Sequence, residues 1–287
     1  MPVAYLNGDF QPLQEARVSV LDRGFLFGDG IYEVIPVYGG RLFRLSRHLA
    51  RLRNSLDGVR IGNPLTDAQW ETLLTELVTR NGGGDQAVYL KVTRGADSRR
   101  DHAFPTGIAP TVFAMSSPLP VPRDPGSVSG VAAITLADIR WKLCNIKAIT
   151  LLPNVLMRQQ AIDAGSVEAI LINDGYAIEG AASNLFIVQH GVILTPPLSN
   201  ALLPGITRGL ILELAAGNAM PYREAAIPET DLHAADEIWL TSSTREISPV
   251  ILLDDRPVGD GRPGPQWQKM MGLYQDYTAA VRRGEKD

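Results

Sequence analysis

The chain has 287 residues, with 27 basic and 31 acidic side chains and a formal net charge of −4. This length predicts two domains, and an apolar share of 45% suffices for a buried core. Nucleic acid is not an expected partner, because phosphate contacts need clustered cations and the candidate cluster, Arg99 and Arg100, is too short. The absence of a signal-like N-terminus, of any run of ~18 apolar residues, and of any cysteine besides Cys144 predicts a cytoplasmic protein without a membrane span or disulfide.

The first part of the chain predicts a small α/β domain over residues 1–118. Turn residues and hydrophobic spacing mark its elements. In order, they are a hairpin at Asn7-Gly8, a glycine-rich loop over 24–30, a strand over 31–38, a helix with Ser46 as N-cap, a helix over 67–80, and strands over 87–93 and 111–115.

The segment 116–130 contains four prolines together with serine and glycine, which is typical of a linker. We therefore expect a linker over 119–130 and a second domain over 131–287. The expected elements are strands over 131–136 and 237–241, a helix over 154–164, hairpins at 173–175, 190–191 and 254–255, a helix after Gly205, and a last helix from Pro265. This is an α+β pattern in two lobes.

Lys147 is a candidate for covalent chemistry. Its neighbours Ile146 and Ala148 predict partial burial, which disfavours the ammonium form and favours a reactive amine. A lysine that extends its charge to solvent from a strand end explains the same pattern and is the more frequent case. Lys142 competes for the role but lies in a polar setting.

Three further segments offer polar groups to a small molecule. The helix start at Ile206 and Thr207 has free N–H groups that suit a phosphate, although capping explains Thr207 equally well. Ser242 and Ser243 belong to a run of hydroxyls after a buried strand, where they bind an anion or cap a turn. Glu179 precedes small residues that would let a flat ring approach, or it is a plain turn residue.

Two cationic positions complete the candidates. Arg51 shares one helix face with His48 and Ser55, although an exposed arginine is the commoner case. Arg100 and His102 lie on a loop, where they clamp a carboxylate or are simply solvated. Neither histidine has metal-ligand spacing to a cysteine or acid cluster, so no metal site is expected.

Several short motifs follow one another along nearly the whole chain. They are Asp22-Arg23-Gly24, Phe27-Gly28-Asp29-Gly30-Ile31-Tyr32-Glu33, His48-Leu49-Ala50-Arg51-Leu52, Asp138-Ile139-Arg140-Trp141, Ile146-Lys147, Leu152-Pro153-Asn154, Glu179-Gly180, Gly205-Ile206-Thr207-Arg208 and Thr241-Ser242-Ser243-Thr244. Each motif alone is weak, but their order and spacing together are specific. The chain resembles the class IV (fold type IV) pyridoxal-phosphate transaminases, and most closely the D-amino acid (D-alanine) aminotransferases.

The resemblance implies a small N-terminal α/β domain, a larger β-barrel-like C-terminal domain and a role for each candidate. Lys147 would hold pyridoxal 5'-phosphate as an internal aldimine and move the substrate proton, while Glu179 would pair with the ring nitrogen. Substrate carboxylate binding would fall to Tyr32, Arg100 and His102, on a loop that reaches the neighbouring subunit's site, so a homodimer is implied. The remaining cofactor contacts would come from Arg51, Ile206, Thr207 and Ser243 at the phosphate and from Ser242 and Leu203 at the ring.

The resemblance leaves some alternatives open. Because one residue more than the family pattern separates Gly95 from Arg100, Arg99 is an alternative clamp residue. Tyr32 and the Arg-x-His loop favour amino transfer from D-alanine or D-glutamate to a 2-oxo acid. Branched-chain aminotransferase is the second choice, and an aminodeoxychorismate lyase or R-selective amine transaminase shares the scaffold. A non-catalytic cofactor-binding protein is disfavoured, because binding alone would not need Glu179.

Overall fold

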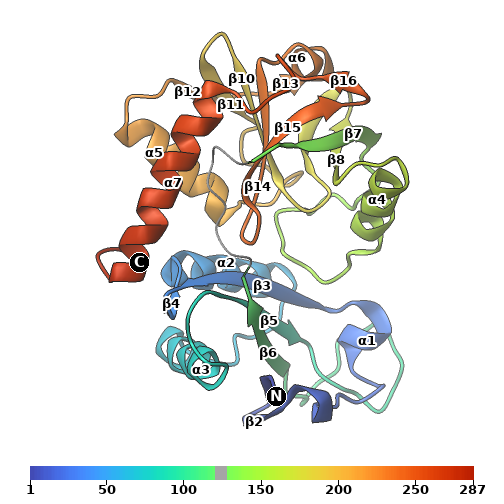
Figure 1. The fold of residues 1–287 in the computed structure, drawn as a ribbon. Coiled ribbons are helices and arrows are strands. Elements are labelled where there is room, and N and C mark those ends of the chain that lie inside the picture. The colour runs from blue at the N-terminus through green and yellow to red at the C-terminus, as the bar shows by residue number, and fades with distance from the viewer. Residues whose placement is uncertain (120–127) are drawn as a thin grey trace. The chain divides into compact units, whose positions relative to one another are not determined.

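The computed structural model describes residues 1–119 and 128–287 and contains two compact units (Figure 1). The N-terminal unit comprises Met1–Pro120, Ile146–Thr150 and Thr278–Asp287, and the C-terminal unit comprises Val121–Asn145 and Leu151–Tyr277. The linker expected at 119–130 falls mostly on residues 120–127, which lie outside the described residues. Within the described ranges, no helix combines the length and apolar character needed to cross a membrane.

The N-terminal unit is built on an antiparallel six-stranded sheet in the order β2-β1-β6-β5-β3-β4. Helices α2 and α3 contact this sheet. The elements are β1 (Val3–Leu6), β2 (Asp9–Pro12), a 3₁₀ turn (Leu13–Glu15), α1 (Arg23–Phe27), β3 (Gly30–Tyr38), β4 (Arg41–Leu42), α2 (Leu45–Gly58), α3 (Asp67–Arg80), β5 (Gln86–Thr93) and β6 (Thr111–Pro118). The core includes Ile35, Leu52 and Trp70, which are fully buried.

Helix α3 confirms the helix expected over 67–80 and begins with a capping box formed by Thr66 and Gln69. Two local predictions were wrong. The glycine-rich segment 24–30 begins as α1, because Asp22 accepts a hydrogen bond from the main chain of Gly24 and caps a helical turn. Helix α2 has Arg44 as its N-cap, in the left-handed region, so Ser46 lies inside the helix rather than before it.

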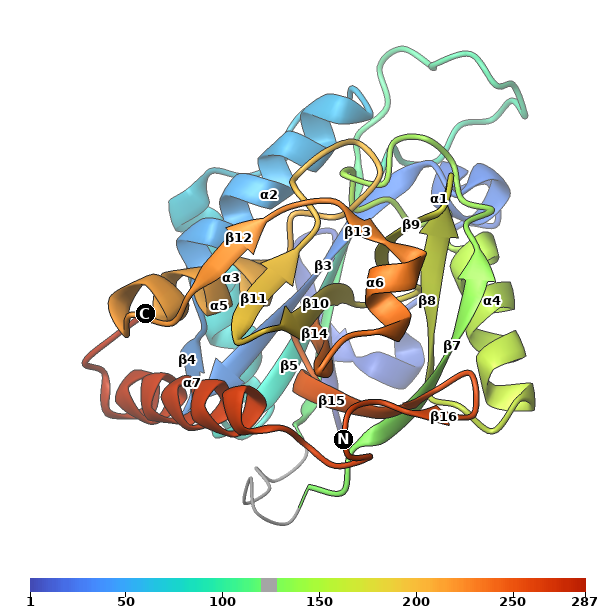
Figure 2. The same cartoon turned by 90° about the horizontal axis from the view of Figure 1, so that it is seen from above.

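The C-terminal unit contains a ten-stranded sheet, in which β10-β14-β15-β7-β8-β9 are neighbours in turn (Figure 2). An additional pairing between β9 and β10 closes these strands into a six-stranded barrel. The elements are β7 (Val131–Ala137), α4 (Leu152–Asp163), β8 (Glu168–Asn173), β9 (Tyr176–Gly180), β10 (Asn184–Gln189), β11 (Val192–Thr195), α5 (Ile206–Gly217), β12 (Tyr222–Glu224), β13 (Ile227–Pro228), α6 (Glu229–His233), β14 (Glu237–Ser242), β15 (Glu246–Leu253), β16 (Arg256–Pro257) and α7 (Pro265–Arg283).

The barrel confirms the α+β class and the β-barrel-like second lobe. Its strands are rich in β-branched and aliphatic residues, and Ile170, Leu185 and Ile238 from three of them are fully buried in one core. Helix α4 covers β7 and β8 with its buried side chains Met157 and Ala161.

Two segments depart from the domain division expected from sequence. Residues Ile146–Thr150 belong to the N-terminal unit, because Tyr32 donates from its main-chain nitrogen to the carbonyl oxygen of Lys147 at 3.0 Å and Ile146 joins that unit's core. The end of the chain belongs there too, since the guanidinium of Arg282 pairs with Asp85 at 2.7 Å. Pairing with residues distant in sequence decided both positions.

Candidate active site

Lys147 lies in a short extended segment that pairs with the beginning of β3. Its main-chain nitrogen donates to Ser55 Oγ at 3.2 Å, and its Nζ is 4.1 Å from the centroid of the Tyr32 ring. The structure thus brings together two predicted site residues, Lys147 and Tyr32. Lys147 is half-buried beside β3 between two buried neighbours, whereas Lys142 is exposed.

A buried ionic cluster lies on the inner face of α2. Arg51 donates from Nε and Nη2 to the two carboxylate oxygens of Glu33 at 2.8 and 2.7 Å, and His48 Nδ1 lies 2.8 Å from the same carboxylate. Burial opposes ionisation, but Arg51 and His48 together hold the pKa of Glu33 well below its usual range. Burial lowers the pKa of His48, so a neutral imidazole donates from Nδ1 to the acceptor-only carboxylate.

The predicted phosphate ligand Arg51 is therefore oriented by Glu33, a residue to which the sequence patterns assigned no role. The expected grouping of His48, Arg51 and Ser55 on one helix face holds, and all three are buried. The period-two alternation of β3, which directs Glu33 inward beside buried Ile31 and Ile35, is the sequence signal that points to an internal partner.

In the C-terminal unit, Glu179 on β9 is a buried carboxylate with several donors around it. Arg140 Nη1 donates to its Oε1, Asn184 Nδ2 donates to Oε2 at 3.0 Å, and the main-chain nitrogen of Leu203 donates to Oε2 at 3.1 Å. Burial raises the pKa of Glu179 to about 7, and Arg140 acts against that rise. Two predicted residues, Glu179 and Leu203, are therefore in direct contact.

Arg140 is the principal residue of this unit's site that sequence reasoning missed. Its Nη2 and Nε donate to Asp138 at 2.7 and 2.9 Å while Nη1 binds Glu179. Burial disfavours the guanidinium charge, but the two carboxylates outweigh it and raise the pKa of Arg140. From sequence, Asp138 and Arg140 indicated only a polar setting for Lys142; the buried ion pair appears only when β9 is placed beside them.

The beginning of α5 lies next to this carboxylate through Asn184. Gly205 is the N-cap of α5, and no side chain among the described residues caps the first turn of the helix. A Cβ on Gly205 would lie 1.9 Å from Asn184 Oδ1, so only glycine fits. Thr207 is buried in the first turn. Asn184 thus donates both to Glu179 and to the carbonyl oxygen of Leu203, shortly before α5.

Strand β14 brings the predicted hydroxyl cluster to the same part of the C-terminal unit. Thr241 pairs with Asn184 across β10 and β14, and its buried Oγ1 has no hydrogen-bond partner among the described residues. Ser242 Oγ accepts a hydrogen bond from the main chain of Arg245 at 3.3 Å, and Ser243 is half-buried at the turn. An uncapped helix start beside hydroxyls, one of them unsatisfied, fits a phosphate group.

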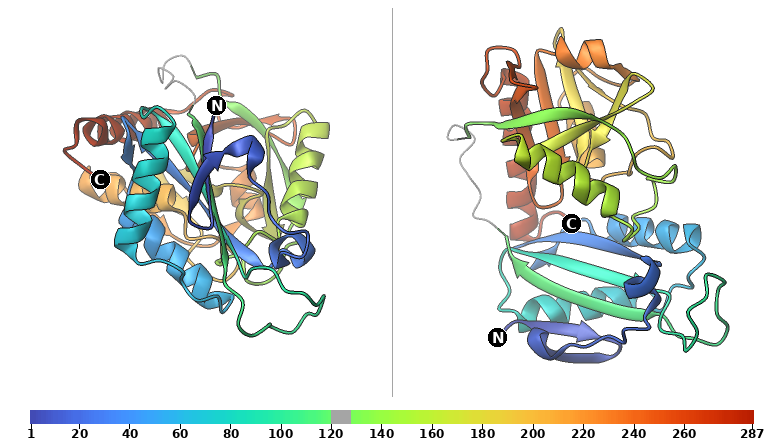
Figure 3. Two further views of the ribbon diagram at one scale, coloured as in Figure 1. Left: turned by 90° about the horizontal axis from the view of Figure 1, so that it is seen from below. Right: turned by 90° about the vertical axis from the view of Figure 1, so that its right-hand side faces the viewer.

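The third group of predicted residues lies on the loop between β5 and β6, residues 94–110, which we call the β5–β6 loop. Arg100 Cζ and the His102 ring lie 5.2 Å from the centroid of Phe27, and both side chains are exposed. Arg100 and His102 thus both contact the ring of Phe27. The loop extends beyond the ends of its two strands (Figure 3).

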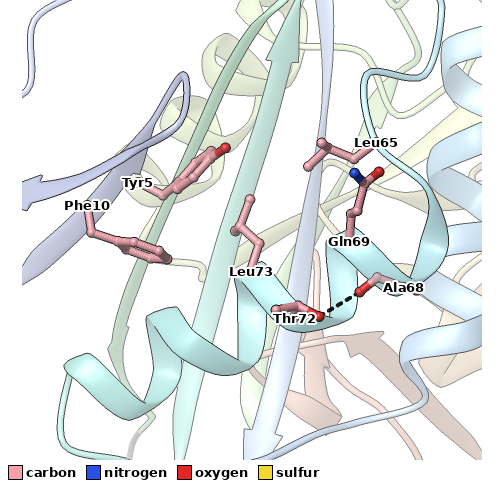
Figure 4. Close-up of a pocket in the computed structure, with 7 residues that line it drawn as sticks. All are labelled: Tyr5, Phe10, Leu65, Ala68, Gln69, Thr72 and Leu73. Carbon is pink, nitrogen blue, oxygen red and sulfur yellow. Dashed lines mark hydrogen bonds between the residues drawn. The ribbon is translucent and has the colours of Figure 1, made fainter.

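A pocket elsewhere in the N-terminal unit does not compete with these groups. It lies between the β1–β2 hairpin and α3, with Tyr5 and Phe10 of the hairpin facing Gln69, Thr72 and Leu73 of α3 (Figure 4). It has a volume of about 370 Å³, and no lysine, histidine or carboxylate lines it. Over the described ranges, no cluster of three or more His, Cys, Asp or Glu side chains is arranged to hold a metal.

Known proteins resemble this chain over most of its length. Residues 30–253 match the family model of amino-transferase class IV. The chain is 41% identical over 270 residues to a D-alanine aminotransferase of Bacillus licheniformis, covering 94% of this chain and 95% of that protein.

Solved structures share the fold. A branched-chain aminotransferase from Thermoproteus uzoniensis, solved with norvaline, superposes with a TM-score of 0.87 at 28% identity, covering 100% of this chain and 96% of that one. A fold IV-transaminase from Curtobacterium pusillum gives a TM-score of 0.80 at 26% identity over 96% and 92% of the two chains. With its half-buried lysine, its paired buried glutamate and its uncapped helix start, the chain belongs to the class IV aminotransferases.

Proposed function

We propose that this aminotransferase moves the amino group of D-amino acids, of the D-alanine and D-glutamate type, to a 2-oxo acid with pyridoxal 5'-phosphate as cofactor. The observation that carries the proposal is the pair of amine and acid sites: Lys147 over Tyr32, and Glu179 buried among Arg140, Asn184 and Leu203. The relatives with 41% and 37% identity are named D-alanine aminotransferase, which supports D-amino acids as donors.

The residues present fit this cofactor. The N–H groups of Ile206 and Thr207, with the hydroxyls of Thr207 and Ser243, would hold its phosphate. The Thr241 hydroxyl, buried without a partner among the described residues, supports a polar ligand in this region. Arg51, oriented by Glu33, would add a cationic contact. Leu203 would pack on the ring, with Ser242 close to it.

Glu179 would accept a hydrogen bond from the ring nitrogen. Arg140 and Asn184 hold the carboxylate in one orientation, and a protonated ring nitrogen would add a cation that favours its ionised form. When bound, the cofactor supplies an electron sink for the electrons released when the substrate Cα loses its proton. Lys147 would hold the cofactor and accept that proton on Nζ, beside the Tyr32 ring.

Substrate recognition would rest on Tyr32, Arg100 and His102. A guanidinium offers two parallel N–H donors to a carboxylate, and an adjacent imidazole adds a third. The α-carboxylate of a D-amino acid would meet these donors while its Cα–H is presented to Lys147. The exposed guanidinium and imidazole on Phe27 support this role, since both are directed to a common platform and not buried in the protein.

A homodimer belongs to the same proposal. Helix α4 presents an exposed apolar stripe in which Leu152, Val155 and Leu156 are 68%, 58% and 50% exposed, at the spacing of one helix face. The projecting β5–β6 loop would reach the site of a second copy of the chain. The single cysteine, Cys144, fits a reducing compartment, and we propose the cytoplasm.

The decisive experiment for substrate class is a set of half-reactions. The cofactor-loaded enzyme is mixed separately with D-alanine, L-leucine, an R-amine and aminodeoxychorismate, and loss of its visible absorbance is followed. We expect D-alanine to discharge the enzyme fastest. Faster discharge by L-leucine would favour the branched-chain activity of the solved relatives. Release of pyruvate from aminodeoxychorismate, or preference for the amine, would replace the proposal by a lyase or an amine transaminase.

The amine and the dimer are tested separately. Borohydride reduction followed by peptide mapping should place the cofactor on Lys147, and a label on the exposed Lys142 would contradict the assignment. Arg100→Ala and Lys147→Ala should each impair turnover of D-alanine on their own. Mixing the two protomers should partly restore activity, because a mixed dimer has one site with both changes and one with neither. No restoration, together with a monomeric mass in solution, would refute the shared site.

A further inference from the structure

The β5–β6 loop is held by residues of α1 that have no assigned role in the reaction. Arg23, buried in the first turn of α1, donates from Nη1 and Nη2 to the carbonyl oxygens of Asp101 and His102 at 2.5 and 3.2 Å. These two carbonyl groups belong to the residues directly after Arg100, and one of them is that of His102 itself. The main chain that carries the two clamp side chains is therefore hydrogen-bonded to a buried guanidinium.

Phe27, at the end of α1, supports the side chains themselves. Its ring centroid lies 4.8 Å from Arg23 Cζ, 5.2 Å from Arg100 Cζ and 5.2 Å from the His102 ring, which is tilted by 46°. Guanidinium and imidazole planes near an aromatic ring lose part of their rotational freedom before any ligand binds. A pre-ordered arginine loses less conformational entropy on binding a carboxylate than a solvated one.

Asp29, two residues after Phe27, holds the two arginines that support the loop. Its carboxylate accepts from Arg23 Nε at 2.8 Å and from Arg94 Nε at 2.7 Å. Arg94 also lies 3.7 Å from the ring centroid of Phe104, farther along the same loop. Burial opposes ionisation of Asp29, yet hydrogen bonds from Arg94 and Arg23 lower its pKa, so the carboxylate keeps its charge near neutral pH.

We propose that Phe27 and Asp29 are positioning residues for substrate carboxylate binding: Asp29 fixes Arg23 and Arg94, these fix the β5–β6 loop, and Phe27 orients Arg100 and His102. The inference rests on the proposed role of Arg100 and His102, and it extends that role to residues that touch no substrate. Recognition of the α-carboxylate would then depend on a preformed support and not on the loop alone.

The experiment compares Phe27→Leu and Asp29→Asn with Phe25→Leu in the full-length, cofactor-loaded enzyme. Phe25 lies on the same helix and is 71% exposed, so it is a matched control. We expect the first two variants to raise KM for D-alanine about three- to tenfold with kcat nearly unchanged, since they alter positioning and not proton transfer. In these two variants, the KM for an amine substrate without a carboxylate should stay the same. Phe25→Leu should change neither KM nor kcat for D-alanine.

A second measurement needs no catalysis. Trypsin cleaves after exposed arginines, so the rate of cut after Arg99 or Arg100 reports how firmly the loop is held. We expect a several-fold faster cut in Phe27→Leu and Asp29→Asn and no change in Phe25→Leu. Unchanged KM and unchanged cleavage in both variants would overturn the inference. If Arg100→Ala itself leaves the KM for D-alanine unchanged, the proposed function fails instead, whatever the cleavage rates show.

Discussion

Replacing Glu179 by glutamine should remove a pH dependence of stability that burial has created. The pKa of this carboxyl group is raised from an ordinary 4.5 to about 7. Because the folded protein holds the proton more tightly than the unfolded chain, the group contributes its full stability below its unfolded pKa. That contribution is lost as the pH rises through the folded pKa. Between pH 5 and pH 8 the loss is about 2.5 kcal/mol, at about 1.36 kcal/mol per pKa unit.

The assay is urea unfolding of cofactor-free wild type and Glu179→Gln at pH 5 and pH 8. All other titrating groups are common to both proteins, so the difference between them isolates this carboxyl. Relative to wild type, the glutamine variant should be about 2.5 kcal/mol more favourable at pH 8 than at pH 5. The cofactor is removed because a cationic ring nitrogen would lower the pKa of Glu179 and mask the effect.

Glu33→Gln supplies a control of opposite sign. Arg51 and His48 lower the pKa of Glu33, so its stabilising contribution is present above the unfolded pKa and is lost as the pH falls. This variant should therefore be more destabilised at neutral than at acid pH. An identical pH profile for wild type and Glu179→Gln would show that Arg140 cancels the cost of burying Glu179, and would refute the reasoning.

Three further predictions concern single contacts. Gly95→Ala should lower the melting temperature and raise KM for D-alanine, because Gly95 has φ +108° and an added Cβ would lie 2.1 Å from the carbonyl oxygen of Ala109 at the base of the β5–β6 loop. Arg140→Met should cost about 3–5 kcal/mol in urea unfolding at pH 8, since it leaves Glu179 without its cation, and an equal loss at pH 5 would contradict this origin. Thr241→Val should stabilise the cofactor-free protein by about 1 kcal/mol in the same assay, because it removes a buried hydroxyl without a partner among the described residues; a loss would show that the hydroxyl is bonded.

Local sequence patterns determined the elements whose stabilising contacts lie within a few residues. Helix α3 is an example, since its capping box and its buried Trp70, Leu73, Leu74 and Leu77 follow the helical period. The sequence also predicted two lobes and a last helix from Pro265, which is the first residue of α7. The family motifs also predict that Lys147, Glu179 and Thr207 serve one reaction, because their order along the chain is specific even where each motif is weak.

Tertiary structure alone decided how those residues are held. Glu33 and Arg51 are 18 positions apart, and Arg140 and Glu179 are 39 apart, so no local spacing reveals either buried ion pair. The lysine segment joined the N-terminal unit because its main-chain groups found partners on β3, although most of its neighbours in sequence belong elsewhere. A buried charge or main-chain group must be paired wherever the fold offers a partner, and that partner is set by three-dimensional proximity and not by position in the sequence.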